Sequence, residues 1–168
     1  MTCLDVSEKM LEIAKENLGT KAEIWQANLA EPLFFEDQSF DFIVASLSMH
    51  YVKNWYPVFK EFYRVLRLGG KVIFSTHNPL MDFGYSPNKE YYKIELIETL
   101  WKNGRGDDFH VRYYRRPFNE IVTPVISAGF ILESITEPQP IPQANEIYPE
   151  EYEFYCSNPC FIFIQAQK

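Results

Sequence analysis

The sequence has few cysteines, few basic residues and no long apolar run, and each shortage argues against a class of protein. Its three cysteines, Cys3, Cys156 and Cys160, have no accompanying histidine cluster, so we expect neither a disulfide framework nor a metal site. Lysine and arginine total 16 against 23 acidic residues, and the formal net charge of -7 disfavours nucleic acid as a partner. No apolar run approaches the roughly 20 residues that span a bilayer, and the amino terminus has no signal-peptide core, so we expect a cytoplasmic protein without membrane contact.

The remaining composition is that of one domain with an ample core. The chain has 168 residues, of which 46% are hydrophobic and 17% aromatic. We find no internal repeats, linkers or low-complexity tracts. A single domain over residues 1–168 is therefore expected.

The middle of the sequence predicts a strand, a helix and a second strand. Residues 42–45 are a short apolar run, typical of a strand that is covered on both faces. Residues 57–67 carry apolar side chains at helical spacing, and Gly69 and Gly70 follow where a left-handed residue ends a helix. Residues 71–75 then give the next strand. A unit of this length implies a right-handed crossover between parallel strands, whose carboxyl ends hold ligand sites.

Polar side chains follow the first of these strands, where such a site is expected. They are Ser46, Ser48, His50 and Tyr51. Among them His50 is a candidate general base, and a simple loop histidine is the alternative.

Two further polar residues follow strands nearer the amino terminus. Residues 2–6 predict a short strand that contains Asp5 near its end, with Ser7 as the N-cap of the next helix. A carboxylate there can accept hydrogen bonds from both vicinal hydroxyls of a ribose, and a surface acid beside a helix start is the alternative. Residues 22–27 predict another strand, after which Asn28 either contacts an adenine edge or forms a turn.

The segment at about 78–117 is unusually aromatic for a connection. Its residues 94–101 are consistent with a short helix, so we expect an insertion that folds over the strand ends as a lid. A satellite core or an oligomer interface is the alternative.

The last third of the chain predicts a helix over 118–128 and two strands. The strands, at 130–137 and 161–166, are expected to pair antiparallel at one edge of the sheet. Three prolines precede an extended connection that we expect to reach Tyr155.

Four motifs in this order resemble those of class I S-adenosylmethionine-dependent methyltransferases. The later part is similar to the small-molecule methyltransferases often called type 11. The motifs are residues 4–11, 26–29, 40–51 and 64–71, with 116–118 and 128–130 in the later part. The resemblance implies an α/β, Rossmann-like fold with a mostly parallel sheet, flanking helices and an antiparallel edge.

The resemblance also implies how S-adenosylmethionine is bound. By this analogy Asp5 binds the ribose hydroxyls and Val6 lies against the adenine. Asn28, where the family more often has Asp, faces the adenine amino group, with the backbone of Leu29 at the ring. Ser46 lines the methionine part of the cofactor.

For the acceptor side, the resemblance places His50 and Tyr51 at the border of the transferred methyl group. His50 is the first candidate base, and Tyr51 and Tyr114 are candidate substrate-positioning groups. His77 and His110 lack this positional support and are expected to be structural or exposed.

The chain departs from the family pattern ahead of Asp5. The family carries a first strand, a glycine-rich loop and a helix there, whereas four residues precede Asp5 and none of the seven glycines forms that loop. The missing strand is the central neighbour of two others. Those two strands then either pair directly, or gain a strand from another chain, or leave the gap open at a cost in unpaired backbone groups. We expect a truncated domain with either a rearranged sheet or a homo-oligomer that completes it.

Three functional hypotheses follow. The first is a methyltransferase that acts on a small molecule, and the second is a noncatalytic protein of the same fold that binds a ligand or oligomerises. The third, a nicotinamide-cofactor oxidoreductase, also uses an acid after its second strand. The loop with His50 and Tyr51, and the strand entry at Gly69 and Gly70, fit the methyltransferase pattern better than that of an oxidoreductase.

Overall fold

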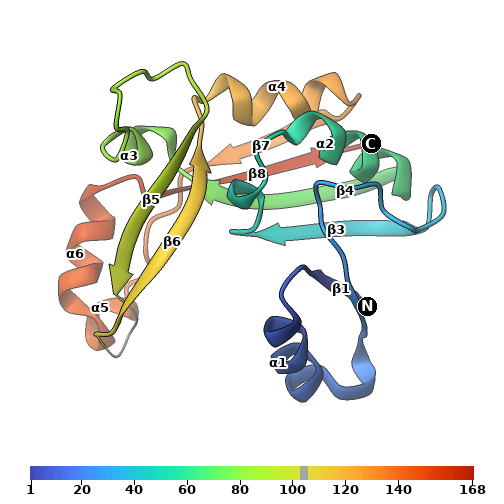
Figure 1. Ribbon diagram of the computed structural model, residues 1–168, viewed down its shortest axis with the longest axis horizontal. Coiled ribbons are helices and arrows are strands. Elements are labelled where there is room, and N and C mark those ends of the chain that lie inside the picture. The colour runs from blue at the N-terminus through green and yellow to red at the C-terminus, as the bar shows by residue number, and fades with distance from the viewer. Residues whose placement is uncertain (103–105) are drawn as a thin grey trace.

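The middle of the chain forms the parallel unit that its hydrophobic pattern predicts. The computed structural model describes residues 1–102 and 106–168. Strand β3 (Phe40–Ser46) runs parallel to β4 (Leu66–His77), and helix α2 (Trp55–Val65) crosses between them after the short η2 turn (Met49–Tyr51). The carboxyl ends of both strands therefore lie at one edge of the sheet (Figure 1).

Helix α2 contributes a large share of the main core. Asn54 caps it by accepting a hydrogen bond from the backbone N–H of Tyr56, which satisfies one of the free donors of the first turn. Its buried stripe packs on the four-stranded sheet and against α4. The buried side chains of this helix are Trp55, Val58, Phe59, Phe62 and Val65.

The two glycines after α2 lie inside β4 and not before it. Gly69 has φ +80°, so the predicted left-handed residue is present, but the strand already begins at Leu66. A Cβ on Gly70 would lie 2.8 Å from the carbonyl oxygen of Arg67 and 3.1 Å from that of Asp41. Glycine at position 70 thus lets β4 and β3 approach closely.

The amino-terminal residues form a separate β–α–β unit. Strand β1 (Thr2–Asp5) leads through α1 (Glu8–Leu18) and the η1 turn (Gly19–Lys21) to β2 (Glu23–Gln26), which pairs parallel with β1. The predicted helix start is confirmed, because the Ser7 side chain accepts a hydrogen bond from the Met10 N–H.

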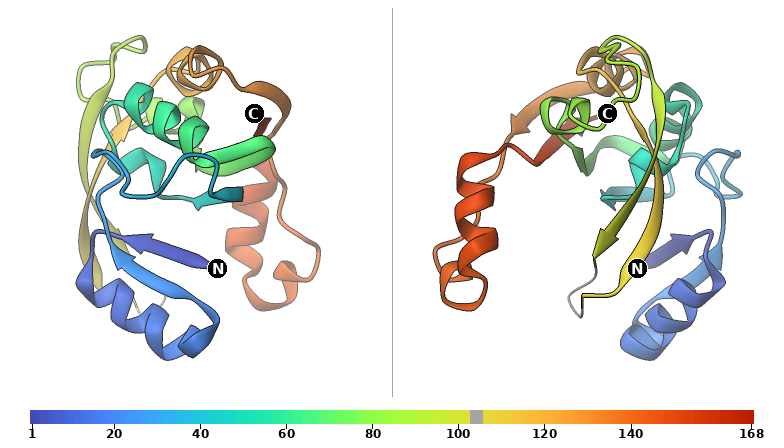
Figure 2. Two further views of the ribbon diagram at one scale, coloured as in Figure 1. Left: turned by 90° about the vertical axis from the view of Figure 1, so that its right-hand side faces the viewer. Right: turned by 60° about the vertical axis from the view of Figure 1, so that its left-hand side comes forward.

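Among the described residues β1 and β3 do not pair, and the position between them holds no strand. One sheet pairs β1 with β2, and a second has four strands in the order β3-β4-β8-β7, where β7 is Ile131–Thr136 and β8 is Phe161–Gln167. The third is a hairpin of β5 (Glu95–Lys102) and β6 (Asp108–Arg115). In Figures 1 and 2 the β1–α1 unit lies beyond β3, on the side away from β4. Phe42 and Val44, which point to the same face of β3, are 64% and 74% exposed, so the expectation that this strand is covered on both faces is wrong.

The aromatic insertion is a hairpin, so the predicted helix over residues 94–101 is wrong. Strand β5 (Glu95–Lys102) pairs antiparallel with β6 (Asp108–Arg115). Within the apolar run the burial alternates, since Ile97 is buried between the exposed Leu96 and Glu98. That period of two is characteristic of a strand with one covered face. The hairpin crosses the end of the sheet near η2 (Figure 1).

The remaining described elements complete the four-stranded sheet and add four short helices. Strand β8 pairs antiparallel with both β4 and β7, so the predicted antiparallel edge is confirmed. None of the described helices is long and apolar enough to cross a membrane. The elements are α3 (Pro79–Phe83), α4 (Asn119–Ser127), β7 (Ile131–Thr136), α5 (Ala144–Ile147), α6 (Pro149–Ser157) and β8 (Phe161–Gln167).

The extended connection expected up to Tyr155 is wrong, because α5 and α6 lie within it. Pro149 stands in the first turn of α6, where a missing N–H costs nothing, and Glu150 and Glu151 follow at the positive end of the helix dipole. The proline-rich pattern ends at Pro142, before these helices begin.

The core role of α2 gives a stability prediction. Phe59 is fully buried, whereas Tyr56 on the same helix is exposed. F59A should lower the free energy of unfolding by about 3–5 kcal/mol through lost burial and the cavity it leaves. Y56A, the matched control, should cost less than about 1 kcal/mol. Urea denaturation followed by circular dichroism measures both, and equal losses would contradict this account of the core.

Candidate functional site

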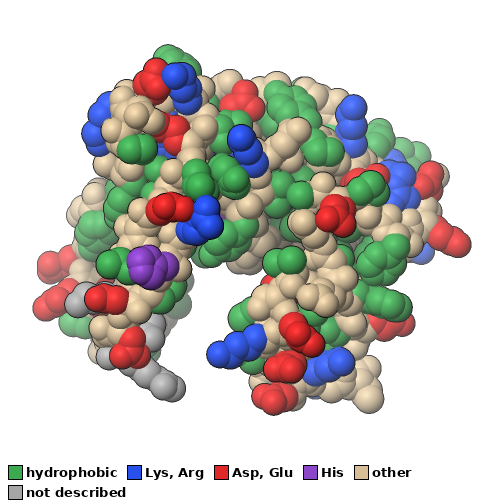
Figure 3. Space-filling model, in the orientation of Figure 1, with side chains coloured by type: hydrophobic (Ala, Val, Ile, Leu, Met, Phe, Trp, Pro, Cys, Tyr) green, Lys and Arg blue, Asp and Glu red, His purple; other side chains and the backbone are tan. Residues whose placement is uncertain are grey.

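The carboxyl ends of the parallel strands collect the polar residues that the sequence singled out. Asp5 ends β1 and Ser46 ends β3. In Figure 1 both strands run toward the hairpin side of the molecule, so Asp5 and Ser46 stand at the same edge. Figure 3 shows a notch in the surface between the hairpin and the β1–α1 unit.

Asp5 is half-buried and shapes the turn into α1. Its Oδ1 accepts a hydrogen bond of 2.8 Å from the backbone N–H of Ser7. The second carboxylate oxygen makes no hydrogen bond to any of the described residues, and it is an acceptor for a hydroxyl group. Val6, the next residue, is largely exposed.

Asn28 forms a turn, which was the alternative to its predicted contact with adenine. Its Oδ1 accepts a hydrogen bond of 3.0 Å from the Ala30 N–H, and its side chain is exposed. The amide nitrogen of Asn28 is a donor at this surface. Leu29 is half-buried and packs against the main core, which positions its backbone at the end of β2.

The end of β3 contains a backbone conformation that non-glycine residues rarely adopt. Leu47 has φ +47°, and its N–H donates to the backbone oxygen of Ser75 at 3.2 Å and to the Ser75 Oγ at 3.1 Å. The Ser46 Oγ lies 3.4 Å from the same hydroxyl oxygen. Such strain is concentrated at ligand sites, and here neighbouring β4 holds it in place.

His50 is enclosed by other rings. It is 3% exposed, and its ring stacks on His77 with centroids 4.2 Å apart and an interplanar angle of 18°. Burial, followed by the neighbouring charges of His77 and Arg116, lowers the pKa of His50 from 6.5 to about 3. His50 is therefore neutral near pH 7. Tyr51 contacts the His50 ring at 4.3 Å and is 55% exposed, so it stands at the border of this cluster.

Sequence reasoning missed three other residues of this cluster. His77 ends β4, Asp82 lies on α3, and Tyr113 lies on β6. The Tyr113 hydroxyl donates to Asp82 Oδ1 at 3.1 Å, and His77 Nδ1 is 3.4 Å from the same oxygen. Burial and then Asp82 raise the pKa of Tyr113, so its hydroxyl keeps its proton and acts as the donor.

A signal for His77 was present in the sequence. It ends the strand parallel to β3, which is the same argument that selected Ser46. His77 is almost buried, and its ring contacts those of His50, Trp101 and Tyr113. His110, by contrast, is exposed on β6 opposite Leu100.

Arg116 joins the hairpin to the η2 turn. Its guanidinium donates to the backbone oxygen of Val52 at 2.7 Å and lies 3.9 Å from the centre of the Trp55 ring. Burial lowers the pKa of Arg116 to about 9. The buried residue therefore fixes the segment that carries His50.

Tyr114 does not join this cluster. Successive strand residues point to opposite faces, so Tyr114 lies on the other face of β6 from Tyr113. Tyr114 is half-buried opposite Leu96 of β5.

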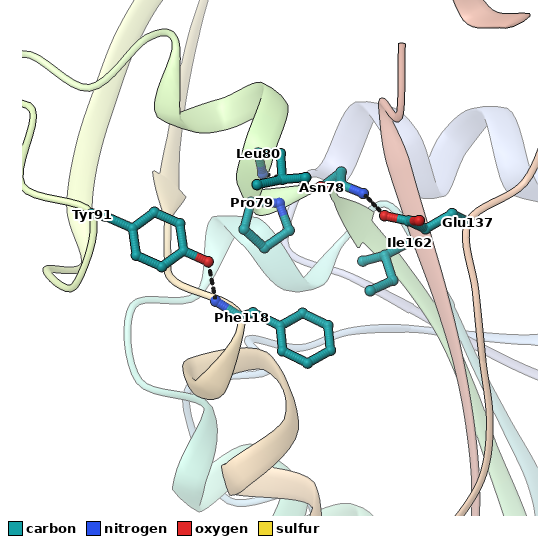
Figure 4. A pocket seen from close by; sticks show the side chains of 7 residues that line it. All are labelled: Asn78, Pro79, Leu80, Tyr91, Phe118, Glu137 and Ile162. Atoms are coloured by element: carbon teal, nitrogen blue, oxygen red, sulfur yellow. Dashed lines mark hydrogen bonds between the residues drawn. The ribbon is translucent and has the colours of Figure 1, made fainter. Parts of the chain in front are cut away.

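A second hollow lies at the ends of β4 and β7. It has a volume of about 180 Å³. Figure 4 shows the Asn78 amide donating to Glu137, and the Tyr91 hydroxyl accepting from the Phe118 N–H. None of the sequence-predicted site residues lines it. Its other walls are Pro79, Leu80 and Ile162.

Comparisons with known proteins agree with this architecture. Residues 1–74 match a family model described as a methyltransferase domain. A demethylmenaquinone methyltransferase of Lactococcus lactis subsp. lactis (strain IL1403) is 37% identical over 122 residues, which cover 63% of this chain and 48% of that protein. The chain thus spans about half the length of this curated relative.

Solved structures share the fold over nearly the whole chain. A crystal structure of an S-adenosylmethionine dependent methyltransferase from Mesorhizobium loti is 22% identical, with a TM-score of 0.75, and the match covers 99% of this chain and 80% of that one. A Listeria monocytogenes protein is also 22% identical, with a TM-score of 0.79, over 99% of this chain and 78% of that one. At this identity the likeness shows the fold.

A buried ion pair joins the two strands of the hairpin. Arg115 Nε lies 2.7 Å from Glu95 Oε2, and the guanidinium also donates to three backbone oxygens of the loop before β5. Burial alone would raise the pKa of Glu95, but hydrogen bonds from Ser86, Asn88 and Arg115 lower it to about 2.

A pH-dependent stability follows from this pair. Because the folded-state pKa of Glu95 lies below the ordinary value of 4.5, its stabilisation is complete above about pH 4.5 and is lost as the pH falls toward 2. E95Q should lower the free energy of unfolding at pH 7 by about 3 kcal/mol and flatten the loss below pH 4.5. The control E98Q breaks an exposed pair with Arg112 on the same strands and should cost at most about 0.5 kcal/mol. Urea titrations from pH 2.5 to 7 test this, and an unchanged acid slope in E95Q would refute it.

Proposed function

Because the chain has the class I S-adenosylmethionine-dependent methyltransferase fold and its first 74 residues match the methyltransferase domain family, we propose that it transfers a methyl group to a small molecule. The observation that carries the proposal is that Asp5 and Ser46 are the last residues of β1 and β3, two strands that end on the same side of the molecule. Asp5 keeps one carboxylate oxygen for a ligand hydroxyl, because Ser7 occupies the other. This arrangement suits the ribose of a nucleoside.

The residues present fit the nucleoside half of S-adenosylmethionine. Asp5 would bind the ribose and Val6 would cover the adenine. Asn28 Oδ1, which also accepts from the Ala30 N–H, would face the adenine amino group, the Leu29 N–H would face the ring, and Ser46 would border the methionine part. Residues 1–168 contain no glycine-rich loop for the amino-acid end of that molecule.

When bound, S-adenosylmethionine supplies a methyl group on a sulfonium, which an acceptor atom takes by in-line displacement. The chain's own task is then to orient the acceptor, exclude water and receive a proton. The rings of Tyr51, Trp101 and Tyr113 around the two histidines supply the dry surroundings. His50 was the candidate base, but a group with a pKa near 3 holds a proton poorly at neutral pH.

We expect the acceptor to be an apolar, ring-containing molecule. Several exposed aromatic side chains lie along the hairpin and its approach, among them Tyr92 and Phe109. The name of the Lactococcus relative, a demethylmenaquinone methyltransferase, points to a substrate of the same kind.

A noncatalytic, self-associating protein is the second candidate. It is favoured by β3, which has no strand beside it on one edge among the described residues and whose Phe42 and Val44 are exposed. A homo-oligomer that covers this edge would bury both side chains and pair the free backbone groups.

Ligand binding tests the first proposal. D5N keeps the acceptor for the Ser7 N–H but removes the charge, so it should weaken binding of S-adenosylmethionine and S-adenosylhomocysteine at least about tenfold. The control E8Q removes an exposed charge from the first turn of α1 and should leave the affinity unchanged. Titration calorimetry measures the affinities. No binding by the unmodified chain at millimolar ligand would overturn the methyltransferase proposal.

The oligomer has its own test. V44K places a charge on the open edge of β3 and should convert an assembly to monomers, whereas L68K, at an exposed position of β4, should not. Sedimentation equilibrium across a concentration series reports the masses. A monomeric unmodified chain at all concentrations would remove this proposal.

A further inference from the structure

The cluster at the end of β4 encloses His77 between elements from distant parts of the chain. Its ring lies 4.2 Å from that of His50, 4.6 Å from Tyr113, 5.6 Å from Trp101 and 6.2 Å from Phe161, measured between centroids. Its side chain is 10% exposed. A polar ring so buried needs a partner or a function.

The charged partner of His77 comes from α3. Asp82 Oδ1 lies 3.4 Å from His77 Nδ1, an ion-pair distance at which the angle does not yet make a hydrogen bond. Nδ1 is accordingly buried without a hydrogen-bond partner among residues 1–102 and 106–168. A small rotation of the imidazole would align the two groups, and the Tyr113 hydroxyl holds the carboxylate oxygen from the other side.

His50 has the opposite surroundings. Its charged neighbours are His77 and Arg116, both of which disfavour a proton on His50. Two stacked imidazoles 4.2 Å apart repel each other strongly if both are protonated. The carboxylate of Asp82 lies beside His77 and not beside His50, while Trp101 and Phe161 contribute no charge.

We propose that His77, oriented by Asp82 and Tyr113, is the proton acceptor at this end of the sheet and that His50 is its neutral stacking partner. The proton is taken to come from the methyl acceptor, and this part of the assignment rests on the proposed function. The placement of His77 beside Asp82 does not depend on it. With its Nδ1 proton toward Asp82, the imidazole presents the lone pair of Nε2.

The proton balance of this step is simple. The acceptor's nucleophilic atom gives up its proton to His77 Nε2 as it gains the methyl group, and the imidazolium is stabilised by Asp82. The proton passes from Nε2 to water when the product leaves, and His77 returns to its neutral form. His77 is thus assigned the catalytic role, whereas Asp82 and Tyr113 are positioning residues.

Nuclear magnetic resonance tests the assignment without requiring activity. The ring-proton signals of the three histidines are followed in the full chain from pH 4.5 to 9, with H110N and H50N used for assignment. The His77 signals should titrate in this range, and those of His50 should not. D82N should change the His77 titration, while D108N, which removes an exposed acid from β6, should leave it as it is. A His50 titration in place of His77, or an unchanged His77 titration in D82N, would overturn the proposal.

Kinetics separates this inference from the proposed function. With S-adenosylmethionine and an apolar phenol or quinol as acceptor, H77N should lower kcat at least about 100-fold with little change in KM. D82N should lower kcat and change the pH profile of kcat, and Y113F should have a smaller effect on both. A larger kcat loss in H50N than in H77N would refute the role of His77. No methyl transfer by the unmodified chain would refute the proposed function, while the titration would still decide the histidine assignment.

Discussion

The parallel pairing of β3 with β4 beneath α2 is the constraint on which the rest of the structure depends. It places Ser46 and His77 at one edge, because strands joined by a helical crossover must run in the same direction. Gly70 permits the close approach of the two strands, and the buried face of α2 holds them against the main core. A change that separated β3 from β4 would disperse the polar groups at their ends.

Two buried arginines extend this order to the hairpin. Arg116 connects the hairpin end to the η2 turn through the Val52 carbonyl and the Trp55 ring. Arg115, at the end of β6, pairs with Glu95 at the start of β5 and donates to backbone oxygens of the loop before β5. The two arginines are adjacent in sequence but contact different segments, because the side chains of neighbouring residues in an extended chain point in opposite directions. The rings around His77 therefore come from three parts of the chain: His50 from the η2 turn, Trp101 and Tyr113 from the hairpin, and Phe161 from β8.

The open place between β1 and β3 divides the candidate site into two halves. The half with Asp5 and Asn28 carries acceptors and donors suited to a nucleoside, whereas the half with His50 and His77 carries two stacked imidazole rings that are almost fully buried. The chain spans about half the length of its Lactococcus relative and about four-fifths of the Mesorhizobium structure. The free edge of β3 and its exposed apolar residues mark where a further strand or a second molecule would pair.

The sequence by itself determined the parallel β3–α2–β4 unit, the β1–α1–β2 unit and the antiparallel edge, because periodicity, caps and glycines act over short distances. It did not determine that residues 94–101 form a strand, since an apolar run is compatible with either period until a partner such as β6 is in place. Only the tertiary structure brought Asp82 and Tyr113 to His77, from elements that share no local pattern. The protonation of a histidine depends on such through-space neighbours, and for that reason the sequence identified His50 while the fold drew attention to His77.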